Sequence, residues 1–266
     1  MLYEILISPF IRKTEMEMAS KISKEYFQIT GKIPGGRFLR RLIHGNRPMG
    51  LQREVFDLNF YNPVGLGAGL DSNCNLYNDL NNLGFSFSEV GPLDLAKTRK
   101  AVRNIQKDPP ADILAACINR DFLKSFTLAY DFCSFFVIEP GQTPYEDALD
   151  PILDARLSYE TYKPIVFKLE ENISGSELQI ILNYCLMNGI DGVQSRSLEQ
   201  TIAIREYTKG RLPIIANCHI RKPQQAAELL EAGADLVELR SALVYDGPGL
   251  VRKTLKYLIN KNANVQ

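Results

Sequence analysis

Positively charged side chains recur at the ends of apolar runs in this sequence. Arg120, Lys168, Arg196 and Arg240 each fall at or just after such a run. If the runs are parallel strands of one barrel, their carboxyl ends share a face and these charges meet there. A cationic rim of this kind suits phosphate or carboxylate, because guanidinium groups bind both in a forked geometry. The alternative is internal pairing with the acidic residues expected on the same face, which are Asp71, Glu139, Glu170 and Glu171.

A second candidate for binding chemistry is the glycine-rich end of an apolar run over residues 62–71. Ala68 and Gly69 lie where this run ends. A glycine carries no Cβ, so a flat ligand can approach its backbone closely. We therefore expect Ala68 and Gly69 to form a surface against which a planar ring could lie.

Other reactive residue types have simpler interpretations beside the functional ones. Lys168 either contacts a ligand or is structural, with its stem buried and its charge directed outward. His219 lies in a loop, where a solvated histidine is more common than a catalytic one. Cys117 and Cys218 are expected to be small buried packing residues. The five cysteines form no C-x-x-C pair, so neither a disulfide framework nor a metal site is predicted.

Composition excludes several classes of function. The 266 residues contain 31 Lys and Arg against 31 Asp and Glu, and this balance gives no overall attraction to nucleic acid. No apolar run reaches the roughly 18 residues of a membrane span. The start of the chain lacks a basic leader and an uninterrupted apolar core, so it does not resemble a signal peptide. We expect a cytoplasmic protein, with peripheral contact at the inner face of the membrane as a further expectation.

Strand and helix patterns alternate from residue 64 onward, as they do around a parallel sheet. Helices are expected over 175–188, after Ser174, and over 223–232, beginning with Pro223. Eight such units predict an α/β fold of the TIM (β/α)8 barrel type, and residues 62–266 are few for that fold, so its loops should be short. Strands are expected near 64–68, 86–90, 112–117, 134–138, 164–169, 190–194, 212–216 and 235–239.

The first part of the chain predicts a helical extension over residues 1–45, followed by one barrel domain over residues 46–266. Apolar residues recur at near-helical spacing between Leu2 and Phe27, and again over residues 38–43. Arg37, Arg40 and Arg41 accompany the second stretch and form either a solvated helix face or a membrane contact. Residues 55–60 suggest a small hairpin before the barrel.

Taken together, several runs resemble the dihydroorotate dehydrogenase family, closest to its quinone-linked, membrane-associated class. The helical lead and residues 54–66 resemble the start of that class, and residues 83–91 resemble its second strand. Residues 62–71 and 242–248 resemble the segments of its first and last strands. Further matches are Thr143-Pro144, Lys168 and Ala232-Gly233-Ala234.

The resemblance implies a TIM barrel with FMN at the carboxyl-end mouth. It implies oxidation of dihydroorotate to orotate in pyrimidine biosynthesis, in which a hydride passes to the flavin and a serine removes a proton. The residues that it places at the cofactor are Ala68, Gly69, Lys168, Arg240 and Ser241.

The sequence departs from the family pattern at most other positions of that site. The loop that holds the family's serine base covers residues 137–143 here and contains no serine, so no catalytic residue is assigned. Ser72 stands where the family has a lysine, and Cys117 stands where it has an asparagine. Cys218-His219 replaces the glycine pair that receives the FMN phosphate, and residues 196–198 replace a Thr-Asn-Thr motif. Bulky side chains at such a pair would block the backbone N–H groups that a phosphate needs.

Three functional hypotheses follow. The first is the family's FMN-dependent oxidation of dihydroorotate. The second is a non-catalytic binding or regulatory relative, a pseudoenzyme that keeps the barrel and an anion site at its mouth. The third is a flavin-free enzyme acting on a phosphorylated small molecule. For the second, the expected ligand is a small anion held by Arg240, Ser241 and Lys168, with the last helix beginning near Ser241.

Overall fold

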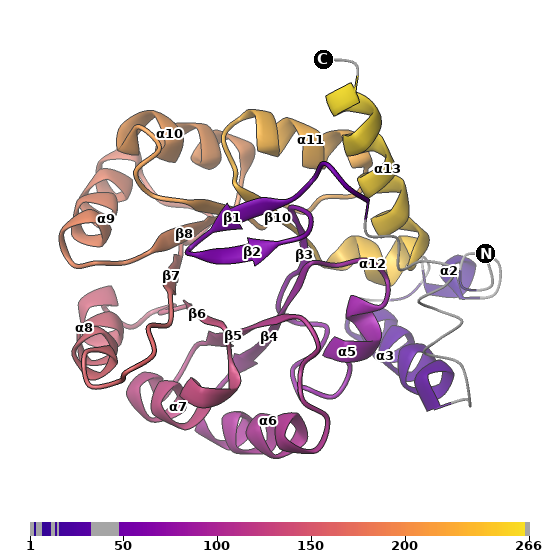
Figure 1. The fold of residues 1–266 in the computed structure, drawn as a ribbon, viewed down its shortest axis with the longest axis horizontal. Coiled ribbons are helices and arrows are strands. Elements are labelled where there is room, and N and C mark those ends of the chain that lie inside the picture. Colours follow the sequence, from indigo (N-terminus) through magenta and orange to yellow (C-terminus); the bar gives the residue numbers. More distant parts are fainter. Residues whose placement is uncertain (1–2, 4–6, 12–13, 15, 33–47, 264–266) are drawn as a thin grey trace.

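The structure, a computed structural model, describes residue 3 and residues 7–11, 14, 16–32 and 48–263. Eight parallel strands close into a barrel in the order β10-β3-β4-β5-β6-β7-β8-β9, and helices surround it (Figure 1). The prediction of a TIM barrel is confirmed. The strands are β3 (Val64–Leu66), β4 (Phe87–Leu93), β5 (Ile113–Ile118), β6 (Phe135–Ile138), β7 (Ile165–Lys168), β8 (Gly192–Ser195), β9 (Ile214–Ala216) and β10 (Leu236–Leu239).

The helices between strands follow the local signals in the sequence. Ser174 accepts a hydrogen bond from the Glu177 amide and so caps α9, while Pro223 opens α11. Gly233, just after α11, has φ +107°, a conformation that favours glycine. The helices of the barrel are α5 (Tyr77–Asn81), α6 (Leu95–Lys107), α7 (Phe122–Ala129), α8 (Tyr145–Arg156), α9 (Gly175–Met187), α10 (Leu198–Thr208), α11 (Pro223–Glu231), α12 (Ser241–Asp246) and α13 (Gly249–Ala263), with a 3-10 turn at Tyr130–Phe132.

The run over residues 241–263 differs from expectation. We expected the last helix to begin near Ser241 and the stretch 242–248 to resemble a strand segment. Instead, Ser241–Asp246 forms the short helix α12, and the last helix, α13, begins at Gly249. Gly247, at φ +76°, ends α12, and Pro248 follows it. A proline has no N–H to continue a helix, so the break lies where these two residues stand.

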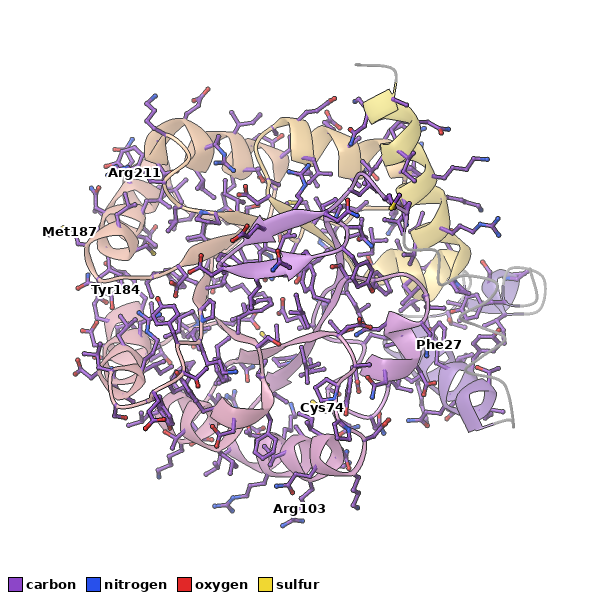
Figure 2. The ribbon with its side chains drawn as sticks, in the orientation of Figure 1. Phe27, Cys74, Arg103, Tyr184, Met187 and Arg211 are labelled. Atoms are coloured by element: carbon purple, nitrogen blue, oxygen red, sulfur yellow. The ribbon has the colours of Figure 1, made fainter. Side chains whose placement is uncertain are left out.

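A hairpin closes the amino-end of the barrel, as the sequence suggested. Strands β1 (Arg53–Val55) and β2 (Leu58–Phe60) pair antiparallel and lie across the ring of strands (Figure 1). Phe56 and Phe60 reach the barrel interior, where Phe60 packs edge-on against Phe87. Gly192 makes room for Phe56, because a Cβ there would lie 2.5 Å from its ring. The side chains in Figure 2 fill the space inside the strands, so the barrel is not an open pore.

The amino-terminal extension packs beside α12. Helix α2 (Ser8–Ile11) contacts α12, and α3 (Met16–Lys32) contacts both α12 and α5. The Tyr3 hydroxyl donates to the Val244 carbonyl, and the Ser8 hydroxyl donates to the Tyr245 carbonyl at 2.6 Å. Two helices beside the barrel are therefore present. The second amphipathic stretch, with Arg37, Arg40 and Arg41, lies outside the described residues, as does the 45/46 boundary.

Candidate functional site

Four polar side chains enter the barrel near its carboxyl-end mouth. Successive side chains of a strand alternate between its two faces. Glu89 of β4, Lys168 of β7, Gln194 of β8 and Glu238 of β10 all face inward and are almost completely buried. The aromatic layer of Phe87 and its neighbours lies below them, so this interior cluster can reach solvent only through the mouth.

Lys168 is surrounded by acceptors. Its Nζ lies 3.3 Å from Glu139 Oε2, 4.0 Å from Glu89 Oε1 and 3.8 Å from Cys117 Sγ. Burial by itself would lower the pKa of Lys168, but Cys117, Glu89, Glu139 and Glu238 outweigh it and raise the pKa above its ordinary value. The ammonium group therefore stays charged, and that charge is already balanced from within the barrel.

Glu238 and Glu89 form a carboxyl pair. Gln194 Nε2 donates to Glu89 Oε2 at 2.7 Å and to Glu238 Oε2 at 3.0 Å. Asn217 Nδ2 also donates to Glu238 Oε2, at 2.8 Å. Burial raises the pKa of Glu238 well above its ordinary value, and the adjacent Glu89 carboxylate raises it further.

A single shared proton would give a hydrogen bond to two oxygen atoms of this pair, Glu238 Oε1 and Glu89 Oε1, the second of which lies 4.0 Å from Lys168 Nζ. Glu89 Oε1 and Glu238 Oε1 are buried without a hydrogen bond, although the two carboxyl groups lie within hydrogen-bonding reach of each other. A proton on Glu238, donated to Glu89, satisfies both groups. The pair then carries one negative charge beside the Lys168 ammonium. In the described part of the chain, no group of three His, Cys, Asp or Glu side chains has an arrangement suited to a metal ion.

The other potentially reactive side chains of the mouth, those of Cys117, Cys218, Thr143 and His219, are not activated as nucleophiles or bases by the described part of the chain. Burial raises the pKa of the Cys117 thiol well above its ordinary value, and burial raises that of Cys218 to about 11. Both thiols therefore stay protonated near neutral pH and are poor nucleophiles. Thr143 is exposed in the loop before α8, and His219 is exposed with φ +29°. His219 thus holds a backbone conformation that favours glycine, in the loop where the family has a glycine pair.

Arg240 covers the glycine face that was predicted to lie against a flat ring. A Cβ at Gly69 would lie 2.8 Å from Arg240 Nε and 2.9 Å from its Nη2. The guanidinium group therefore occupies the space that Gly69 leaves open. Ala68 is buried beside it, and Ser241 is buried at the start of α12.

The remaining charges of the rim do not form one network. Asp71 accepts hydrogen bonds from the backbone N–H groups of Asn75, Leu76 and Tyr77 and so anchors the start of α5. Arg120 is exposed, and Arg196 is partly exposed. Of the acidic residues considered as internal partners, Glu139 does pair with Lys168. Among the described residues, no ion pair joins Asp71, Glu170 or Glu171 to a rim cation.

FMN does not fit the residues present here. A flavin ring against Gly69 would meet the Arg240 guanidinium. Lys168, the cation that the resemblance placed at the cofactor, is held by Glu139 and Glu89. His219 and the partly buried Cys218 stand where a phosphate would need clear backbone N–H groups. No step of a reaction is therefore derived through FMN.

Sequence reasoning missed three members of the interior cluster, namely Glu89, Gln194 and Glu238. A signal for them was present. Each is a polar residue in the middle of an apolar strand, at Ser88-Glu89-Val90, Val193-Gln194-Ser195 and Val237-Glu238-Leu239. Such a residue must face a partner, because burying it alone is costly. The sequence does not show which residues these partners are, because barrel closure decides which strands lie next to one another.

Known proteins share both the sequence pattern and the fold of this chain. No family model matches it. The quinone-type dihydroorotate dehydrogenase of Christiangramia forsetii is 25% identical, covering 98% of this chain and 99% of that protein. The enzyme of the same name from Vibrio vulnificus strain CMCP6 is 25% identical over 97% of this chain and 100% of its own length. The resemblance to the dihydroorotate dehydrogenase family is confirmed.

Solved structures agree in fold. Dihydroorotate dehydrogenase of Eimeria tenella, in a ligand-free form, superposes with a TM-score of 0.74 at 17% identity, covering 94% of this chain and 96% of that one. Its complex with ferulenol gives 0.71 at 18% identity, over 86% and 90% of the two chains. The alignment with the Christiangramia enzyme runs over 338 positions, more than the 266 residues here, so that relative carries segments that this dihydroorotate dehydrogenase-like chain lacks.

The missing length agrees with the short connections at the mouth. A single residue, Asp94, separates β4 from α6. Only residues 139–144 connect β6 to α8, in the place of the family's serine loop. Both connections are short, as the sequence predicted for the loops of this barrel.

The carboxyl pair predicts an unusual dependence of stability on pH. Because the folded-state pKa of Glu238 lies above the ordinary value of 4.5, its contribution to stability is complete below that pH and is lost as pH rises toward the folded pKa. Glu238→Gln, whose amide can donate to Glu89 as the shared proton does, should flatten this decline and make the variant more stable than wild type at alkaline pH. Urea unfolding from pH 5 to pH 9 measures the effect.

Glu89→Gln is the matched control for that experiment. It should destabilise the protein by about 1–3 kcal/mol at neutral pH, because Lys168 loses one of its two carboxylates and buried groups lose a partner. If Glu238→Gln followed the pH profile of wild type, Glu238 would not hold the shared proton.

Proposed function

We propose that this protein is a non-oxidising relative of dihydroorotate dehydrogenase that binds a small anion at the mouth of its barrel. The family's FMN-dependent oxidation of dihydroorotate is the competing function. The observation that favours loss of oxidation is the arrangement of Lys168, whose charge is balanced by Glu139 at 3.3 Å and Glu89 at 4.0 Å. These two carboxylates compete with a flavin or an anionic substrate for the Lys168 ammonium group.

The loop between β6 and α8 supports the same proposal. Its residues 139–144 contain no serine, and Thr143 is exposed in a turn whose amide donates to the Pro140 carbonyl at 3.2 Å. Glu139 is the one acid of the loop that reaches the cluster, and it pairs with Lys168. A base for proton abstraction must come within roughly 3 Å of the substrate carbon and be free to accept a proton, and no side chain of this loop combines both conditions.

Arg240 supports the anion site. Its side chain is exposed, and it lies over Gly69 at the start of α12, beside Ser241. The interior carboxylates lie deeper in the barrel, around Lys168. An anion at the rim would therefore bind Arg240 and Ser241, and Lys168 would act through its charge and not by contact.

We predict that FMN does not bind with sub-micromolar affinity, because Arg240 covers Gly69 and His219 replaces a glycine. Titration of the purified protein with FMN, followed by flavin fluorescence, measures this. Arg240→Ala tests the first obstacle and should still fail to bind, since His219 and the Lys168 ion pairs remain. Sub-micromolar quenching by the wild type would restore the oxidoreductase as the preferred function.

We predict that Arg240→Ala weakens the binding of a small anion about tenfold or more, since a charge-assisted hydrogen bond contributes on the order of 1.5–3 kcal/mol. Calorimetry with phosphate, orotate and ribose phosphates measures the affinity. Arg103→Ala, which removes an exposed arginine on α6, is the control and should change nothing. Equal binding by wild type and Arg240→Ala would remove the anion site from the proposal.

We also propose peripheral contact with a membrane through α3. Met18 and Ile29 of α3 are 59% and 63% exposed, and a spacing of eleven residues places them on one face of a helix. An exposed apolar stripe of this kind is typical of helices that lie in a lipid interface. In the described part of the chain, no helix is both long and apolar enough to cross a membrane.

Flotation with liposomes tests this contact. Met18→Ser with Ile29→Ser should lower the fraction of protein that floats, because the apolar stripe is lost. Met187→Ser, at an 84% exposed position of α9 on the far side of the barrel, is the matched control (Figure 2). If neither variant changed flotation, or if wild type did not float, α3 would have no membrane role.

A further inference from the structure

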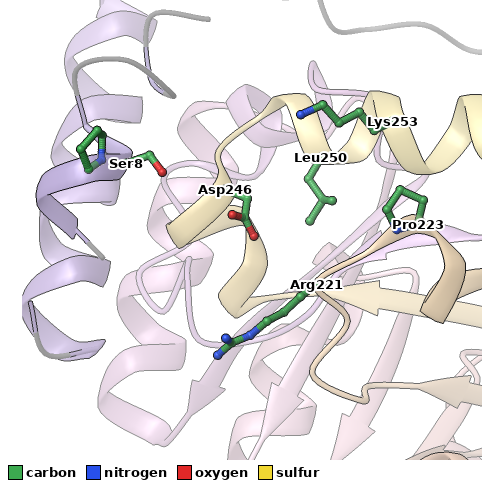
Figure 3. Close-up of a pocket in the computed structure, with 7 residues that line it drawn as sticks. Ser8, Arg221, Pro223, Asp246, Leu250 and Lys253 are labelled. Carbon is green, nitrogen blue, oxygen red and sulfur yellow. The ribbon is translucent and has the colours of Figure 1, made fainter. Parts of the chain in front are cut away.

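Two neighbouring cavities lie between the amino-terminal extension, the loop after β9 and the last helices. Their volumes are about 470 Å³ and 540 Å³, and both are lined by Arg221 and Asp246. Figure 3 shows the residues around the first cavity, with Arg221 on one side and Lys253 on the other. Asp246 ends α12 and Ser241 begins it, so these cavities are distinct from the rim site at Arg240. Their volume is that of a small-molecule site.

Segments far apart in the sequence supply the lining. Arg221 and Lys222 come from the loop between β9 and α11, and Lys253 comes from the first turns of α13. Ser8 and Thr14 come from the amino-terminal extension. Three cationic side chains therefore face one carboxylate, Asp246, and the lining is positively charged as a whole.

Arg221 and Lys222 carry the argument. Both are exposed, and neither makes an ion pair within the described part of the chain. Their backbone amides both donate to Gln225 Oε1, at 2.9 Å and 3.0 Å, which holds the loop against the start of α11. The Arg221 guanidinium lies 5.9 Å from the centre of the Tyr245 ring. The loop is thus held in place, and among the described residues no carboxylate pairs with either of its two charges.

The cavity walls add one further feature. Pro223, the first residue of α11, and Leu250, in the first turn of α13, line the first cavity. Pro9, Pro223 and Leu250 give it an apolar side. A ligand that suits these walls has an anionic group at Arg221 and a less polar body.

We propose that this cavity binds the phosphate group of a phosphorylated molecule, with Arg221 and Lys222 as its principal contacts. A planar guanidinium matches phosphate through two parallel hydrogen bonds, and a neighbouring ammonium adds a point charge. The phosphate belongs either to a soluble phosphomonoester or to a lipid headgroup. The same contacts serve both sources, so the experiment includes an arm for each.

The test measures binding by the full chain. Calorimetry with inorganic phosphate and with ribose 5-phosphate gives the soluble arm, and co-sedimentation with phosphatidylcholine vesicles, with and without phosphatidic acid, gives the lipid arm. The double variant Arg221→Ala, Lys222→Ala should weaken binding at least tenfold in whichever arm the wild type binds. Each arm is repeated in an Arg240→Ala background, where the rim site proposed above is weakened about tenfold or more. Phosphate binding that persists in this background and is lost with Arg221→Ala, Lys222→Ala belongs to the cavity.

A second variant changes the affinity in the opposite direction. Asp246→Asn removes the one carboxylate of the lining and should tighten phosphate binding about threefold, as expected for loss of a nearby like charge near a protein surface. Far-ultraviolet circular dichroism confirms that each variant is folded. The proposal is overturned if wild type binds in neither arm, if the double variant binds as wild type does, or if Asp246→Asn has no effect on affinity. Loss of all binding in Arg240→Ala would assign the phosphate to the rim instead.

Discussion

The ion pairs of Lys168 inside the barrel mouth are the constraint on which the rest of the site depends. A buried ammonium group needs an opposite charge nearby, and Glu139 and Glu89 each supply a carboxylate within 4.0 Å of Lys168 Nζ. Burial and the neighbouring Glu89 carboxylate raise the pKa of a third carboxyl group, Glu238, well above its ordinary value. Gln194 and Asn217 then orient that pair. The charged side chains of the interior cluster are therefore paired with one another. The cationic side chains without such pairs lie at the rim and on the surface outside it.

The amino-end of the barrel makes this arrangement possible. The hairpin β1–β2 and the aromatic rings of Phe56, Phe60 and Phe87 close the barrel from below, so the polar cluster lies in a poorly solvated space. In such a space an unpaired charge is far more costly than at the surface, and a complete network is favoured. The barrel shared with the dihydroorotate dehydrogenases therefore encloses a network of mutually paired polar side chains. Packing preserves the barrel, and a different set of side chains occupies its mouth.

The cationic side chains outside the interior cluster lie at the rim and beyond it. Arg240 stands over Gly69 at the rim, and Arg221 with Lys222 faces the cavity beyond α12. Both positions lie near helix ends and near the amino-terminal extension, whose α3 carries the exposed Met18 and Ile29. The features that remain available to a partner or ligand are thus concentrated on one side of the molecule, around α2, α3 and α12, whereas the barrel interior is closed by its own contacts.

The sequence by itself determined the barrel, because alternating strand and helix patterns, Ser174, Pro223 and Gly233 are local signals that act over a few residues. The absence of a serine from residues 137–143 is likewise visible in the sequence alone. Only the tertiary structure decided which carboxylates pair with Lys168. Glu89 precedes Lys168 by 79 residues and Glu139 precedes it by 29 residues (168 − 89 and 168 − 139). Barrel closure brings all three together. The same holds for Arg240, whose guanidinium group lies over Gly69. Contacts between strands depend on register and closure, and no local pattern encodes them.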